Sequence, residues 1–121
     1  MNILYIEDTR RPERNLEYKN IIHKLGYDGV VTFCDNIEVD NLATLSVDGV
    51  ICHSGMAGYN IVNFFAKKNG WPLLSYSGSV DSTPYLKESS FNRKHFSVDS
   101  DYFETVLPEF IERCKLNKDG N

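Results

Sequence analysis

The chain has 121 residues, which is enough for one domain with a single core. Hydrophobic residues make up 41% and charged residues 25%, as in ordinary globular proteins, and the formal net charge is −4. This acidic balance disfavours nonspecific binding to DNA or anionic membranes. No stretch approaches the about 20 apolar residues of a membrane span, and no secretory pattern opens the chain. We therefore expect a cytoplasmic protein that binds neither nucleic acid nor membrane.

The three cysteines are Cys34, Cys52 and Cys114. Their number is odd and their spacing is wide, which argues against a disulfide framework or a zinc site. Cys52 lies in an apolar run, and Cys114 continues the apolar face of the last helix. We expect both to be small core residues.

Apolar runs alternate with helical patterns in the first half of the chain. Residues 2–7 and 30–34 are predicted strands. Between them, Pro12 suits the first turn of a helix, and Gly26 suits its end. One apolar face of that helix is formed by Tyr18, Ile21, Ile22 and Leu25.

The middle of the chain continues this alternation. A short, weakly patterned helix is predicted at 39–45, and a strand at 48–53. A helix marked by apolar residues at 61–65 follows, and Gly70 ends it. The next strand is predicted at 72–77. Thr83 and Pro84 then begin a short fourth helix, as a cap followed by proline.

The last strand is predicted at 94–98, and the last helix has the clearest periodicity. Its apolar positions are Phe103, Val106, Leu107, Phe110, Ile111 and Cys114. Pro108 should bend or locally open this helix, because it cannot donate to the carbonyl of Glu104. Residues 117–121 are polar and are expected to fray, which leaves one domain over 1–116.

Strands that alternate with helices and are almost continuously apolar indicate a parallel sheet covered on both faces. The predicted fold is α/β, a flavodoxin-like (βα)5 three-layer sandwich with a five-stranded parallel sheet. Ligands of such sheets bind beyond the carboxyl ends of the strands. At that edge we expect Glu7, Asp8, His53 and Ser77.

The residues at these strand ends resemble the receiver domain of bacterial two-component response regulators. The resemblance rests on the acid pair Glu7-Asp8, on the polar end of the middle strand with Met56 after it, and on Ser77-Gly78. In receivers, the middle strand ends in an aspartate that accepts a phosphoryl group, and the hydroxyl helps to hold that group. Here His53 takes the place of the aspartate and cannot form an acyl phosphate.

The acid pair has two interpretations. Glu7 and Asp8 can hold a hard cation such as magnesium, or they can form a solvated strand end in which Asp8 caps a turn. Replacing a carboxylate by His53 removes an anionic ligand and favours softer metals. We expect a degraded magnesium site without a cofactor. A small metal site of Glu7, Asp8 and His53 is the alternative.

Receivers also carry a lysine at the end of the fifth strand, and two registers compete for that position. In one, Lys94 matches the family lysine, but Asn92 and Arg93 are then buried, which is costly for an unpaired charge. In the other, His95 and Phe96 are the buried pair and Ser97 takes the lysine position. The second register is preferred, so the lysine is expected to be lost.

The resemblance implies a stand-alone pseudo-receiver signalling domain, not an enzyme, that contacts a protein partner or a second copy. In receivers that contact uses helix four, strand five and helix five, which here corresponds to Pro84, Tyr85, Lys87, Lys94, Phe96, Asp101 and Glu104. One alternative is a divergent switch that binds an ion at Glu7, Asp8 and His53. Another is a small flavodoxin-like enzyme or ligand-binding protein.

Overall fold

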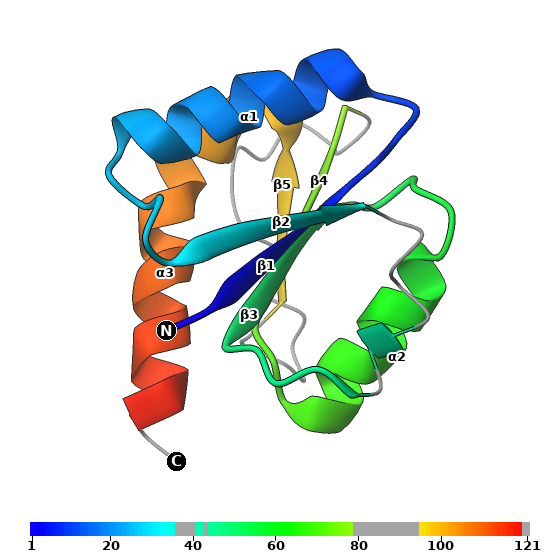
Figure 1. The fold of residues 1–121 in the computed structure, drawn as a ribbon, viewed down its shortest axis with the longest axis vertical. Helices are drawn as coiled ribbons and strands as arrows, with labels where there is room; N and C mark the ends of the chain where they lie inside the picture. Colours follow the sequence, from blue (N-terminus) through cyan, green and yellow to red (C-terminus); the bar gives the residue numbers. More distant parts are fainter. Residues whose placement is uncertain (36–40, 43, 79–94, 120–121) are drawn as a thin grey trace.

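A computed structural model of the chain describes residues 1–35, 41–42, 44–78 and 95–119 (Figure 1). Strands and helices alternate through most of this part of the chain. Their bounds are β1 Ile3–Glu7, α1 Pro12–Lys24, β2 Val31–Asp35, β3 Gly49–His53, α2 Tyr59–Asn69, β4 Leu73–Ser77, β5 His95–Asp99 and α3 Phe103–Asp119, with a short 3-10 helix at Ser100–Tyr102 before α3.

The five strands form one parallel sheet in the order β2-β1-β3-β4-β5. This is the predicted flavodoxin-like order, so the fold class is confirmed. All strands are parallel, and their carboxyl ends therefore meet at one edge of the sheet. The switch in strand order lies between β1 and β3, where ligands of such sheets bind.

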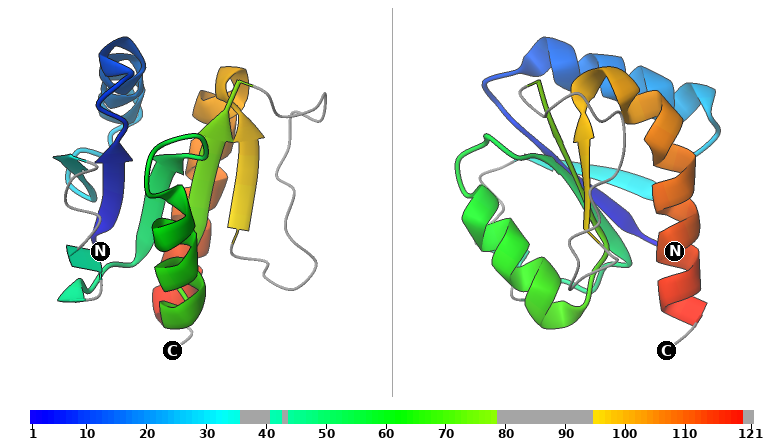
Figure 2. Two further views of the ribbon diagram at one scale, coloured as in Figure 1. Left: turned by 90° about the vertical axis from the view of Figure 1, so that its right-hand side faces the viewer. Right: turned by 180° about the vertical axis from the view of Figure 1, so that it is seen from behind.

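Helices cover both faces of the sheet, as Figure 2 shows. α1 and α3 lie on one face, and α2 lies on the other. Alternate residues of each strand enter the two cores: Tyr5 packs on the α1 and α3 side, whereas Leu4 and Ile6 pack on the α2 side. All six apolar positions predicted for the last helix are buried. Cys52 and Cys114 are buried free thiols, as expected.

Gly49 allows α3 to pack closely against the start of β3. A Cβ atom there would lie 2.5 Å from Sγ of Cys114 and 3.2 Å from the ring of Phe110. Gly70 ends α2 in the left-handed region, with φ 70°, as its position predicted.

The end of the chain differs from the prediction. α3 continues to Asp119, into the segment 117–121 that was expected to fray. Asn117 donates from Nδ2 to the carbonyl of Gly70 at 3.2 Å, and Nζ of Lys118 lies 3.8 Å from the carboxylate of Asp48. These contacts hold the last turn against the rest of the domain.

Two further helix predictions have different outcomes. Pro108 lies on the exposed face of α3, and the helix is not interrupted there. Water can reach the carbonyl that proline leaves without a donor, which makes the residue tolerable. The helix predicted at Thr83-Pro84 lies outside the described residues, as do residues 39, 40 and 43 of the helix predicted at 39–45. No described helix is long and apolar enough to cross a membrane.

Candidate functional site

Asp8 follows β1 at the carboxyl edge of the sheet, and its side chain is fully buried. Arg10 holds the carboxylate with a fork of two hydrogen bonds. Nε of Arg10 donates to Oδ1 at 3.1 Å, and Nη2 donates to Oδ2 at 3.2 Å. The backbone N–H of Arg10 also donates to Oδ1, at 3.1 Å. Charge-assisted bonds of this two-pronged kind are among the strongest in proteins.

His53 ends β3 and approaches the same carboxylate from the other side. Its Nδ1 lies 3.1 Å from Oδ2 of Asp8, and its side chain is 8% exposed. Nε of Arg11 lies 3.9 Å from the same oxygen. The carboxylate is therefore surrounded by one imidazole and two guanidinium groups.

These contacts set the charge states of the pair. Burial alone would raise the pKa of Asp8, but the hydrogen bonds from Arg10 and His53 hold it below its usual value. Burial lowers the pKa of His53, and the nearby Arg11 and Arg10 act in the same direction, although Asp8 opposes them. A neutral His53 beside an ionised Asp8 must carry its proton on Nδ1, from which it donates to Oδ2.

Arg10 also links two loops. Its Nη2 donates to the carbonyl of Gly55 at 2.7 Å, which joins the turn after β1 to the loop after β3. Gly55 packs closely against His53: a Cβ atom at this position would lie 2.9 Å from Cε1 of the imidazole. The absence of a side chain at residue 55 thus lets His53 reach Asp8.

A buried hydrogen-bond network holds the turn that follows β1. The hydroxyl of Tyr5 donates to Oδ1 of Asn15 at 3.3 Å, and the hydroxyl of Tyr76 lies 2.9 Å from that of Tyr5. Nδ2 of Asn15 donates to the backbone carbonyl of Asp8 at 2.9 Å. Burial raises the pKa of both tyrosines, so both hydroxyls stay protonated. The network connects β1, β4 and α1 beneath the carboxylate.

Glu7 does not share this site with Asp8. Its carboxylate forms an ion pair with Lys19 of α1, whose ammonium group also lies 5.0 Å from the ring of Phe33. Of the predicted trio Glu7, Asp8 and His53, only the last two are in contact. Within the described residues, no group of three or more His, Cys, Asp or Glu side chains is placed to hold a metal ion.

The residue at the carboxyl end of β5, where receivers carry a lysine, is neither of the two residues expected from the sequence. β5 begins at His95, which is half-buried, and Phe96 and Val98 are its buried residues. Of the pair His95 and Phe96 expected to be buried in the preferred register, only Phe96 is therefore buried. However, Ser97 pairs with Ser75 inside the sheet, whereas Ser77 pairs with Asp99 at the edge. Asp99, not Ser97, therefore lies beside Ser77. The side chain of Asp99 accepts a hydrogen bond from the backbone N–H of Asp101. Lys94 lies outside the described residues.

The predicted partner face needs a correction. Phe96 is buried and packs edge-on against Phe110 beneath α3, so it cannot contact a partner. Glu104 is bound at 3.0 Å by Lys24 of α1. Asp101 is exposed. The other four residues of the predicted face, Pro84, Tyr85, Lys87 and Lys94, lie outside the described part of the chain.

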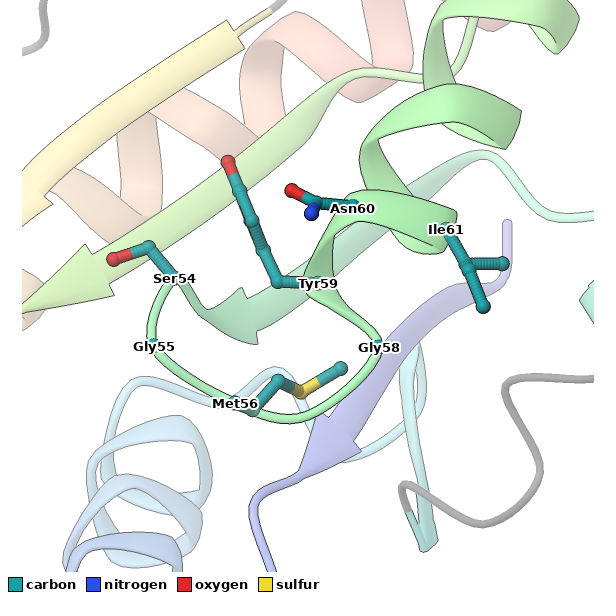
Figure 3. Close-up of a pocket in the computed structure, with 7 residues that line it drawn as sticks. All are labelled: Ser54, Gly55, Met56, Gly58, Tyr59, Asn60 and Ile61. Carbon is teal, nitrogen blue, oxygen red and sulfur yellow. The ribbon is translucent and has the colours of Figure 1, made fainter.

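A shallow hollow of about 370 Å³ adjoins the site (Figure 3). It follows the loop that leads from the end of β3 into α2, and Arg10 reaches the same loop at Gly55. The residues that line it are Ser54, Gly55, Met56, Gly58, Tyr59, Asn60 and Ile61.

Arg10, Arg11 and Asn15 were missed by the sequence reasoning. A signal for Arg10 was present: a residue two positions after an aspartate often donates its backbone N–H to the carboxylate in a turn, as Arg10 does. Nothing local to the sequence indicated that the guanidinium group would fold back onto Asp8.

Similar proteins were found only among solved structures. No protein-family model and no curated protein matches the chain. One similar structure is a de novo designed Rossmann 2x3 fold protein, with a TM-score of 0.66 at 14% identity. The match covers 93% of this chain and 90% of the designed protein. Another is a fusion containing the yeast Spc42 trimeric coiled coil, with a TM-score of 0.63 at 16% identity. The match covers 99% of this chain and 83% of the fusion chain. At these identities the likeness establishes a Rossmann-like α/β fold.

Proposed function

We propose that this chain is a pseudo-receiver signalling domain that works in the cytoplasm by protein–protein contact, without phosphoryl transfer or other catalysis. Support comes from the residues at the strand ends. Asp8 and His53 meet where receivers hold their acid pair and phosphoacceptor, and Ser77 ends the adjacent strand. The imidazole of His53 cannot form the acyl phosphate of that family.

The observation that carries the proposal is the enclosure of Asp8. Both carboxylate oxygens accept hydrogen bonds from Arg10, and Oδ2 also accepts one from His53. A magnesium ion prefers several oxygen ligands and gives up its water reluctantly. It would have to displace the guanidinium group to reach Asp8. The arrangement therefore favours a site held closed by an internal cation over the alternative of a divergent ion-binding switch.

The proposal is tested by incubating the protein with magnesium and acetyl phosphate or phosphoramidate and then measuring its intact mass. A receiver that retains its acceptor aspartate serves as the positive control. We expect no phosphate adduct on this chain. A stoichiometric adduct that is lost in mild alkali would contradict the proposal, because an acyl phosphate hydrolyses there whereas a phosphohistidine does not.

A further inference from the structure

We propose that the exposed face of α2 binds an acidic amphipathic helix of a partner protein. The inference deepens the proposed function, on which it rests, by naming the contact surface and the chemistry of the partner. We call the residues Ile61, Phe64, Lys67 and Lys68 the α2 surface.

The centre of the α2 surface is apolar and open to solvent. Ile61 is 42% exposed and Phe64 is 58% exposed, whereas Val62 and Ala66 on the other side of the helix are buried in the core. Ile61 and Phe64 are three residues apart, so they are neighbours on one side of the helix. A large exposed aromatic ring beside an aliphatic side chain is typical of the anchor of a protein interface.

Positive charge lies at both ends of α2, on either side of Ile61 and Phe64. Lys67 and Lys68 lie in the last turn of α2, and Nζ of Lys68 is 5.9 Å from the ring centroid of Phe64. At the other end, Gly58 provides no side-chain cap, and no acidic residue lies in the first turn. The partial positive charge of the helix N-terminus is therefore not offset by its own side chains. In a chain of net charge −4, this surface favours an acidic partner.

The shape of the surface fits a helix. From Ile61 to Lys68 the helix rises about 10 Å, which matches two turns of a partner helix. Ile61 also borders the hollow at the start of α2, into which an apolar partner side chain can project. A second copy is a poor occupant, because α2 paired with itself brings positive ends together whether the two helices run parallel or antiparallel.

The test uses NMR with the isotope-labelled protein and two synthetic helical peptides of about 18 residues, long enough to form a helix. Both carry the same leucine row, but one is flanked by glutamates and the other by lysines. We expect saturable shifts at Ile61, Phe64 and Lys68 with the acidic peptide, and at least about tenfold weaker binding of the basic peptide.

Variants locate the surface. Phe64→Asp should weaken binding of the acidic peptide at least about tenfold. The double variant Lys67→Glu, Lys68→Glu should reverse the preference between the peptides. The matched control is Leu116→Asp on α3, where the leucine is 60% exposed, and it should leave binding unchanged.

Three results would overturn the inference: no saturable shifts, shifts elsewhere on the protein, or equal losses with Phe64→Asp and Leu116→Asp. Concentration-dependent self-association through α2, or binding to anionic vesicles without binding to the peptide, would assign the surface to a different occupant and also overturn it. The phosphorylation test separates the two proposals. A phosphate adduct contradicts the proposed function, whereas failed peptide binding without an adduct contradicts only the α2 surface.

Discussion

Arg10 lies across the carboxylate of Asp8, with Nε 3.1 Å from Oδ1 and Nη2 3.2 Å from Oδ2, while Asp8 itself is fully buried. Although 60% of the arginine side chain is exposed, its guanidinium group closes the strand edge. The charge of Asp8 is thereby balanced from within the chain.

Replacing Arg10 by alanine tests this balance. Arg10→Ala leaves a buried carboxylate without its two strongest donors, and we expect a loss of about 1–3 kcal/mol in the free energy of unfolding. Because Arg10 is partly exposed, water can replace some of the lost bonds. Urea unfolding measures the effect. Lys24→Ala, which breaks the exposed pair with Glu104, is the control and should cost at most about 1 kcal/mol. Equal small losses would show that Asp8 does not depend on Arg10.

Acidification should destabilise the fold in two stages. The pKa of His53 is lowered from its ordinary 6.5, so the unfolded chain binds more protons and stability falls as the pH drops below 6.5. His95 behaves in the same way, because burial and then Lys67 lower its pKa. The pKa of Asp8 is lowered from 3.8 in the folded protein. The stability that ionised Asp8 contributes is therefore fully present above pH 3.8, and it is lost as the pH falls through the lowered pKa.

Urea unfolding across this pH range resolves the contributions. His53→Gln keeps a donor for Asp8 but does not titrate, and it should reduce the slope below pH 6.5. His95→Gln should reduce this slope further. Asp8→Asn should remove the part of the stability loss below pH 3.8 that comes from protonation of Asp8. A His53→Gln variant with an unchanged slope would argue against a depressed pKa for His53.

Magnesium sensitivity should be greatest when the guanidinium group of Arg10 is removed. The unmodified chain should show the same midpoint of thermal unfolding with and without millimolar magnesium. The double variant His53→Asp, Arg10→Ala places a second carboxylate beside Asp8 and removes the guanidinium group. It should be unstable alone, because like charges repel, and magnesium should stabilise it by binding the native state. The single variant His53→Asp should respond less. No response of the double variant would mean that residue 53 cannot complete an ion site with Asp8.

Gly55→Ala tests the packing around His53. The added Cβ would lie 2.9 Å from Cε1 of the imidazole, so the ring must shift away from Asp8. We expect a destabilisation of about 1–3 kcal/mol, as for other overpacked sites. Gly29→Ala is a suitable control, since a Cβ there meets no atom within 4 Å and the backbone is not left-handed. Chemical denaturation of both variants gives the comparison, and equal stabilities would contradict a tight contact at residue 55.

Much of the fold was predictable because it follows from local patterns. Apolar runs identified the strands, and the periodicity of the last helix identified all of its buried positions. The end of α3 was not predictable, since Asn117 and Lys118 are held by Gly70 and Asp48, which are far away in the sequence. The sequence also did not predict that Asp99 lies beside Ser77 at the sheet edge. β5 extends one residue further than expected, to Asp99, and only its pairing with β4 shows which residue lies there.

The sequence by itself determined that Asp8 and His53 lie at one edge of a parallel sheet, because Asp8 follows one apolar strand and His53 ends another. It also determined that residue 53 cannot be an acyl-phosphate acceptor. The tertiary structure alone decided that Glu7 pairs with Lys19 while Asp8 pairs with Arg10. The physical reason is that the position of Arg10 depends on the carbonyl of Gly55, which lies 45 residues along the chain and reaches the site only when β3 pairs beside β1.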